Sequence, residues 1–260
     1  MSSTSSPADY GIDAPYVLRN LLIAGTAALL VWLSIAFGFW SGRIGPLRFG
    51  PTGFLIMAIF FFASSAGMLW SSKIGKVRER EKLLSKISWR GDEQVLDVGC
   101  GRGLLLIGAA KRLTTGMATG VDIWQTEDLS GNKPEATLEN ARRENVAERV
   151  KIETADIRKL PFANASFDVV ISRAAIHNLY AAGDRTAAIR EIARVLKPGG
   201  LALIDDIRHF RQYAEIFTEN GCDVRRINSP AAAMFWTILT FGSLHPATLL
   251  VRKSPDHQKS

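Results

Sequence analysis

The stretch Val95-Leu96-Asp97-Val98-Gly99-Cys100-Gly101-Arg102-Gly103 decides the fold of this chain. Its first four residues are mostly apolar or β-branched, which is typical of a buried parallel strand. Three alternating glycines then predict a turn, and an apolar helical pattern follows over residues 104–113. Strand, glycine turn and helix together predict a site where a nucleotide-like ligand approaches bare backbone, because a Cβ there would collide with the ligand or forbid a positive φ.

The spacing of the glycines argues against a dinucleotide cofactor. A dinucleotide fingerprint has glycine at the first, third and sixth positions of the turn. The sixth position here is Leu104. A nicotinamide-dependent oxidoreductase is therefore the weaker hypothesis, and competition between cofactors would test it.

More strand patterns follow the glycine turn in order. Residues 118–123 predict a second strand that ends near Asp122, where a carboxylate is placed to accept hydrogen bonds from ribose hydroxyls. Residues 150–154 predict a third strand, which Asp156 follows. The later motifs are Leu-Pro-Phe at 160–162, Ser-Phe-Asp-Val-Val-Ile at 166–171, Leu-Lys-Pro-Gly-Gly at 196–200 as a helix stop and turn, and a fifth strand at 201–205.

This succession resembles the class I S-adenosylmethionine-dependent methyltransferases over residues 91–253. The resemblance implies an α/β, Rossmann-like fold, in which a seven-stranded, mostly parallel sheet carries helices on both faces. Residues 222–228 and 247–252 would then be its last two strands, as an antiparallel pair. The resemblance also implies S-adenosyl-L-methionine as cofactor, with Asp156 accepting from the adenine amino group. Ile123 and Trp124, just after Asp122, are expected to pack on the adenine face. The expected cofactor-binding residues are Asp97, Gly99, Cys100, Gly101, Gly103, Asp122, Ile123, Asp156, Ile157 and Arg173.

The segment after the fourth strand holds the candidates for acid–base chemistry. A sulfonium methyl is already activated, so a base is needed only when the acceptor must lose a proton. His177 is the first candidate for that base and Tyr180 the second. The alternative is that His177 caps the following helix. Asp205 and Asp206 end the fifth strand at the same edge, and the sequence does not choose between substrate binding and solvation for them.

Two uncharged runs precede the methyltransferase-like region, at residues 21–40 and 54–70. A helix needs about 20 apolar residues to cross a bilayer, with a working range of about 17–25. We therefore expect a transmembrane hairpin over residues 17–72, preceded by a disordered cytoplasmic leader at 1–16. A signal peptide and buried core helices are the alternatives.

The positive charge of the chain is concentrated beside this hairpin. The formal net charge is +7, and residues 73–90 alone carry +5. We expect a basic juxtamembrane linker helix over 73–90 that contacts anionic lipid on the cytoplasmic side. A nucleic-acid enzyme would spread basic charge over its catalytic domain, so no nucleic-acid partner is expected. The prediction is an integral membrane protein with a cytoplasmic catalytic domain.

Metal and disulfide chemistry are not expected. The two cysteines, Cys100 and Cys222, form no C-x-x-C pair, and the four histidines have no metal-ligand spacing. A reduced compartment fits this pattern. The tail at 254–260 is expected to be disordered.

We therefore expect methyl transfer to a small-molecule or lipid acceptor that is lipophilic or associated with the membrane. The apolar connection at 231–242 is expected to roof the acceptor pocket, to dip into the membrane interface or to pack as a helix in a satellite core. The alternative function is a membrane-tethered, catalytically inactive binding or assembly module that retains the fold. The sequence does not set the oligomeric state.

Overall fold

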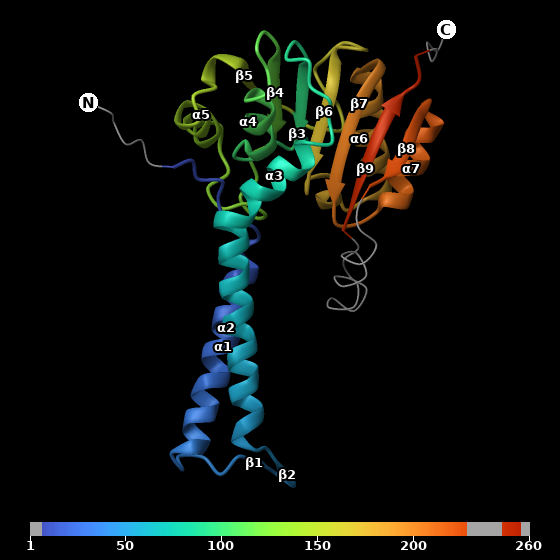
Figure 1. Ribbon diagram of the computed structural model, residues 1–260. Coiled ribbons are helices and arrows are strands. Elements are labelled where there is room, and N and C mark those ends of the chain that lie inside the picture. Colours follow the sequence, from blue (N-terminus) through green and yellow to red (C-terminus); the bar gives the residue numbers. More distant parts are fainter. Residues whose placement is uncertain (1–6, 228–245, 256–260) are drawn as a thin grey trace, which may run out of the picture. The chain divides into compact units, whose positions relative to one another are not determined.

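The computed structural model describes residues 7–227 and 246–255, in two compact units (Figure 1). The sheet unit comprises Met1–Asp9, Arg80–Trp124 and Lys133–Ser260, and the hairpin unit comprises Tyr10–Glu79 and Gln125–Asn132. The predictions for residues 1–6, for the connection at 231–242 and for the end of the tail lie outside the described residues.

The sheet unit is built on seven strands in the order β5-β4-β3-β6-β7-β9-β8. The first five in this order pair in parallel, and β9 is antiparallel to both β7 and β8. The predicted sheet and its antiparallel last pair are therefore confirmed. The strands are β3 (Gln94–Val98), β4 (Met117–Asp122), β5 (Val150–Thr154), β6 (Phe167–Arg173), β7 (Leu196–Asp206), β8 (Cys222–Arg226) and β9 (Ala247–Lys253).

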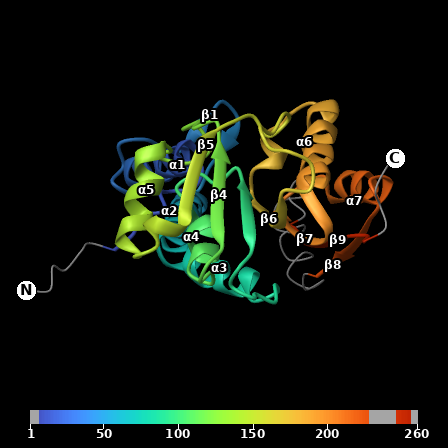
Figure 2. The same cartoon turned by 90° about the horizontal axis from the view of Figure 1, so that it is seen from above.

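Helices flank this sheet (Figure 2). The alternation of side chains along β3 shows which faces of the sheet α4, α6 and α7 cover. Leu96 and Val98 belong to one buried cluster with α6 and α7. Gly120, the register partner of Asp97, faces Leu106 of α4. Because neighbouring side chains of a strand point to opposite faces, α4 covers the face opposite α6 and α7. The helices are α4 (Leu104–Ala110), α5 (Pro134–Arg143), α6 (Ala182–Val195), α7 (Phe210–Glu219), η2 (Ala147–Arg149) and η3 (Ile176–Asn178).

One predicted turn is part of a strand. We expected residues 196–200 to stop a helix and turn. The helix does end at Val195, directly before them, but β7 already begins at Leu196. Leu196 pairs with Phe167, and the register then shifts so that Leu201 pairs with Val169. The residues Lys-Pro-Gly-Gly thus form an irregularity inside the β6–β7 ladder, where a proline without an N–H is tolerated.

The hairpin unit contains two long antiparallel helices, α1 (Pro15–Ala36) and α2 (Pro51–Trp70), which lie side by side (Figure 1). A short β1 (Arg43–Ile44) and β2 (Leu47–Arg48) connect them, and the π-helical turn η1 (Ser71–Gly75) follows α2. Gly25 lets the helices approach, because a Cβ there would lie 3.2 Å from Phe62. Both helices begin earlier than the uncharged runs at 21–40 and 54–70, since prolines start them at their first turns.

The described part of the leader, which we expected to be disordered, is hydrogen bonded. Ile12 donates its N–H to Ser130 Oγ at 2.8 Å and accepts from the N–H of Ser130 at 3.1 Å. The buried Lys76 ammonium donates to the carbonyls of Tyr10 and Gly11, both at 3.1 Å, and pairs with Asp13. These partners lie more than 50 residues away in sequence, and no local pattern indicates them.

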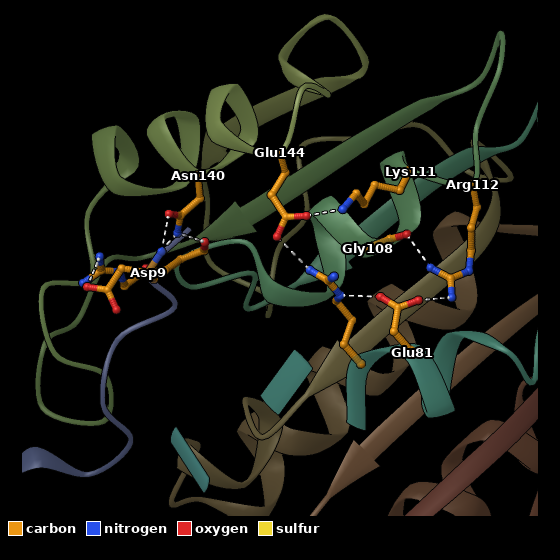
Figure 3. A network of polar contacts seen from close by, with 9 residues as sticks. Asp9, Glu81, Gly108, Lys111, Arg112, Asn140 and Glu144 are labelled. Atoms are coloured by element: carbon orange, nitrogen blue, oxygen red, sulfur yellow. Dashed lines mark hydrogen bonds and ion pairs between the residues drawn. The ribbon is translucent and has the colours of Figure 1, made fainter. Parts of the chain in front are cut away.

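The linker helix α3 (Lys76–Leu84) attaches to the sheet unit through a charge network (Figure 3). Arg80, only 3% exposed, pairs with Glu81 at 2.8 Å and with Glu144 at 3.3 Å. Arg112 joins Glu81 at 2.7 Å, and Lys111 pairs with Glu144. Part of the positive charge of the predicted basic linker therefore lies in ion pairs within the protein.

Gly108 of α4 leaves the space that α3 needs. An added Cβ would lie 2.6 Å from Arg80 Cδ and 2.6 Å from Leu84 Cδ1. We expect Gly108→Ala to destabilise the protein, because overpacking costs about 1–3 kcal/mol and exceeds the helix-propensity gain of about 0.5–1 kcal/mol. The melting temperature of the full chain would show it. Gly183→Ala, where an added Cβ meets nothing within 4 Å, is the control, and equal melting temperatures for the two variants would contradict the close packing.

Candidate functional site

The glycine turn between β3 and α4 has the backbone that its sequence predicts. Gly99, Gly101 and Gly103 have φ values of 72°, 51° and 83°, a region that side chains disfavour. A Cβ on Gly99 would also lie 2.3 Å from Ala175 Cβ. The turn therefore lies directly against the segment that follows β6.

Hydrogen bonds from two other elements hold this turn. Asp122, at the end of β4, accepts from the Gly101 N–H at 2.8 Å. From α5, Thr137 Oγ1 donates to the Gly101 carbonyl at 2.6 Å, and Asn140 Nδ2 donates to the Arg102 carbonyl at 3.0 Å. Thr137 and Asn140 are three residues apart and so share one face of the helix.

Asp97 is a buried carboxyl below the turn. It is 2% exposed, and its Oδ2 has no hydrogen-bond partner among the described residues. Burial, together with the nearby Asp122 carboxylate, raises the pKa of Asp97 to about 8. The same burial raises the pKa of the Cys100 thiol, so Cys100 is a packing residue rather than a nucleophile.

The carboxyl end of β4 presents an acid and an apolar side chain. Asp122 also accepts from the Trp124 N–H at 2.7 Å, so its two oxygens are each already bonded to backbone. A carboxylate offers about four lone-pair sites, which leaves capacity for ribose hydroxyls. Ile123 is 50% exposed, as an adenine-packing residue must be before the cofactor binds. Trp124 instead donates its indole N–H to Thr154 Oγ1.

The remaining cofactor candidates lie at or just beyond the ends of neighbouring strands. Two of them, Asp156 and Arg173, form ion pairs with other residues of the chain. Asp156 accepts from the Arg158 guanidinium at 2.6 Å, and this contact lowers the pKa of Asp156. Arg173 pairs with Asp205 at 3.3 Å. Ile157 packs partly buried against the main core cluster. An adenine amino group would therefore share Asp156 with Arg158, a partner that sequence reasoning missed although it stands two residues away.

His177 lies in η3, two residues beyond the contact with Gly99, and it is paired with a buried carboxylate. Its Nδ1 is 2.6 Å from Asp206 Oδ1, and its backbone N–H donates to Asp206 Oδ2 at 3.1 Å. Asp206 is 3% exposed and also accepts from Tyr213 Oη at 3.3 Å and from the Ile207 N–H at 2.8 Å. Burial and Asp206 raise the pKa of Tyr213, which keeps its proton for this bond.

This arrangement separates the two acid–base candidates. His177 is held in one orientation by Asp206, whereas Tyr180 is 97% exposed. The sequence left Asp205 and Asp206 between substrate binding and solvation, but Asp206 is buried and bonds to His177 instead. Alternation along β7 buries Asp206 and leaves Asp205 to bind Arg173 and Thr248. Among the described residues, no group of three or more His, Cys, Asp and Glu could hold a metal ion.

Comparison with known proteins finds a family match in this part of the chain. The family model described as a methyltransferase domain matches residues 96–204. Residues 96–204 are similar to that family. They span β3 to β7 and include the glycine turn, Asp122 and His177.

Curated relatives of this domain carry methyltransferase names. The 27-O-demethylrifamycin SV methyltransferase of Amycolatopsis mediterranei is 35% identical over 50% of this chain and 44% of the relative. A demethylmenaquinone methyltransferase of Staphylococcus aureus is 32% identical over 48% of this chain and 47% of the relative. The chain thus spans less than half the length of these two relatives.

Solved structures share the fold. The YcgJ protein of Bacillus subtilis has a TM-score of 0.55 at 18% identity, and the match covers 68% of this chain and 98% of that one. The phosphoethanolamine N-methyltransferase 2 of Haemonchus contortus has a TM-score of 0.53 at 21% identity, covering 69% of this chain and 53% of that one, and its structure contains S-adenosylhomocysteine. These structures show that the chain shares their fold, and the family match makes S-adenosylmethionine the cofactor against which the site is compared.

The residues of the site fit that cofactor. S-adenosylmethionine carries a positive charge, and the buried Asp97 Oδ2 is an acceptor still to be satisfied. The glycine turn offers bare backbone, Asp122 offers acceptor capacity for ribose hydroxyls, and Ile123 offers an apolar surface for adenine. Asp97, the glycine turn, Asp122 and Ile123 would therefore hold it.

We expect Asp122 to stabilise the ligand-free glycine turn and also to bind the ligand. In Asp122→Ala, the N–H groups of Gly101 and Trp124 lose a charged partner, an interaction worth roughly 1.5–3 kcal/mol. We expect a lower melting temperature without ligand and an affinity for S-adenosylhomocysteine about ten- to a hundredfold lower. Calorimetric titration and thermal melts measure these two effects. Glu215→Ala, which breaks an exposed ion pair with Arg211, is the control, and unchanged affinity in Asp122→Ala would remove Asp122 from the site.

Asp97 makes the stability of the ligand-free protein depend on pH. Its ordinary pKa is 3.8, and in the fold it is about 8. Between these values the unfolded chain has released a proton that the folded chain keeps, so this group destabilises the fold as pH rises. We expect Asp97→Asn to gain stability over wild type from about pH 5 to about pH 8, by at least about 1.4 kcal/mol, the value of one pKa unit. Parallel melting curves across this range would contradict the shift.

Proposed function

We propose that the chain is a membrane-anchored, S-adenosylmethionine-dependent methyltransferase that acts on a lipophilic acceptor, with His177 as general base. The observation that carries the proposal is the close approach of Gly99, in the glycine turn, to Ala175. Ala175 stands two residues before His177, which pairs with Asp206. The strand order reverses between β3 and β6, and such a switch point is where open α/β sheets bind ligands.

The His177–Asp206 pair is suited to remove a proton. Asp206 accepts hydrogen bonds from a hydroxyl and two backbone N–H groups, so its carboxylate is fixed in place beside Nδ1. The Nδ1–H tautomer leaves the lone pair on Nε2, which can take a proton from an acceptor hydroxyl or acidic carbon.

The proposed reaction is an in-line transfer. S-adenosylmethionine supplies an electrophilic methyl group on a sulfonium. With that cofactor bound, the acceptor atom would bond to the methyl carbon as the carbon–sulfur bond breaks, the electron pair would stay on sulfur, and His177 Nε2 would take the acceptor's proton. Asp206 stabilises the resulting imidazolium, and the turn and Asp122 fix the direction of attack.

The hairpin unit supports the proposed anchor. α1 and α2 are long enough, at 22 and 20 residues and about 1.5 Å per residue, to cross a hydrocarbon core of about 30 Å. Their most apolar 18-residue windows are only 17% and 11% buried. A core helix of a water-soluble domain would be mostly buried, so this alternative does not fit α1 and α2.

The names of relatives support a lipophilic acceptor. One relative is named for demethylmenaquinone, another from Caenorhabditis elegans for a sterol, and a Streptomyces coelicolor structure of similar fold contains geranyl diphosphate. A hairpin anchor would keep the site near acceptors that partition into the bilayer. A catalytically inactive module receives no support from the geometry, because Asp97, Asp122 and His177 all lie around one turn.

The test uses the full chain in lipid nanodiscs. S-adenosylhomocysteine should bind in calorimetry, and methyl-labelled cofactor incubated with fractionated cell extracts should label an extractable lipid. Label confined to the soluble fraction would overturn the lipophilic acceptor, and absence of cofactor binding by the folded chain would overturn the enzyme.

The base can be tested independently of binding. We expect His177→Gln to lower kcat by about 10²–10⁴, the usual contribution of a general base, while the affinity for S-adenosylhomocysteine stays unchanged. His209→Gln, at the histidine that precedes α7, is the matched control. An equal loss of kcat in Tyr180→Phe would transfer the role to Tyr180.

The proposed orientation has a chemical test. Cys100 and Cys222 are buried, so the wild-type chain should react little with an impermeant maleimide. Ser41→Cys, between the two helices, should react only from the side opposite Lys86→Cys in vesicles of known sidedness. Labelling of both variants from one side would exclude two membrane spans.

A further inference from the structure

Asp9, in the leader that precedes α1, contacts the glycine turn between β3 and α4. Asp9 Oδ2 accepts from Arg102 Nη2 at 3.1 Å, and Arg102 stands between Gly101 and Gly103. Its side chain is 16% exposed, and that of Asp9 is 43% exposed. This ion pair joins residues that are 93 positions apart in sequence.

Asn140 connects the same two segments through their backbones (Figure 3). Its Oδ1 accepts from the Asp9 N–H at 2.9 Å, and its Nδ2 donates to the Asp9 carbonyl at 2.9 Å and to the Arg102 carbonyl at 3.0 Å. Asn140 is 2% exposed, so all three hydrogen bonds are shielded from water. Asp9 therefore docks on Asn140 through its backbone and on Arg102 through its carboxylate.

The residues that follow Asp9 are also fixed, within the hairpin unit. Tyr10, Gly11 and Asp13 bind Lys76, and Ile12 pairs with Ser130. Ala14 donates its N–H to the Asp128 carbonyl at 2.9 Å, immediately before α1 begins at Pro15. Residues 10–14 thus have hydrogen-bond or ion-pair partners within the hairpin unit, whereas Asp9 has its partners within the sheet unit.

We propose that the leader is a strap on the cofactor turn and that Asp9 is its positioning residue for S-adenosylmethionine. A turn of three glycines loses much backbone entropy when it is ordered. Ordering it before the ligand arrives lowers the cost of binding. Asp9 does this through Arg102 and Asn140 without touching the cofactor. The inference rests on the proposed function, because it assigns Asp9 to the cofactor site of that enzyme.

The test measures S-adenosylhomocysteine affinity of the full chain in nanodiscs. Asp9→Ala should raise Kd about three- to tenfold, and Asp9→Glu should restore most of the affinity. The melting temperature without ligand should stay within about 2 °C of wild type, since a half-exposed ion pair contributes about 0–1 kcal/mol to stability. In turnover, KM for the cofactor should rise while kcat stays unchanged.

A double-mutant cycle shows whether Asp9 acts through Arg102. Arg102→Ala should raise Kd by itself, and adding Asp9→Ala to it should have no further effect. Fully additive effects would overturn the strap, as would an unchanged Kd in Asp9→Ala. Glu215→Ala, which breaks the exposed i,i+4 pair with Arg211, is the control and should leave Kd unchanged.

Two truncations test the strap without point substitutions. Removal of residues 2–6 should leave Kd unchanged, whereas removal of residues 2–9 should raise it as Asp9→Ala does. Equal affinities for both truncations would overturn the strap while leaving the proposed enzyme intact. Failure of the wild-type chain to bind S-adenosylhomocysteine would overturn both.

Discussion

The backbone of the glycine turn is the constraint on which the site depends. Its three positive φ values can be adopted freely only by glycine, and its close approach to Ala175 leaves no room for a Cβ at Gly99. The freedom that permits this shape also makes it unstable by itself. Asp122, Thr137 and Asn140 supply the hydrogen bonds that compensate, from β4 and α5. The contact with Ala175 then fixes where η3 starts, and with it the position of His177.

The pattern of apolar and acidic residues along the chain predicted the strands of this site. Apolar runs predicted β3 and β4, and the structure places Asp97 and Asp122 near the carboxyl ends of these strands, as the sequence indicated. The pairing of His177 with Asp206 could not be found in the same way, because 29 residues separate them. Sequence placed both at the carboxyl edge of the sheet, but only the alternation along β7 decides that Asp206 rather than Asp205 is buried.

Partners far apart in sequence account for the other differences. Asp9 and Asn140 are 131 residues apart, and a short polar leader resembles a disordered one in composition. Net charge has the same weakness. Seven basic residues in 73–90 indicated a lipid-binding surface, yet Lys76 and Arg80 are 5% and 3% exposed and serve carbonyls and carboxylates of the chain itself. Counting charges cannot distinguish a cation that faces solvent from one that the fold has enclosed.

The distribution of side-chain size in the hairpin unit bears on its proposed surroundings. Small residues lie in the helix interface, where Ala28, Ala58 and Ser65 are buried, and Ser65 bonds back to the Phe61 carbonyl. Large apolar residues face outward, among them Ile23, Leu30 and Phe60, each about 60% exposed. In water, each of these side chains would lack about 25 cal/mol of stabilising free energy for every Å² of apolar surface that stays exposed. Helices in lipid have no such penalty and associate instead through close contact between small residues. The arrangement of α1 and α2 therefore supports the proposal that they lie in a bilayer.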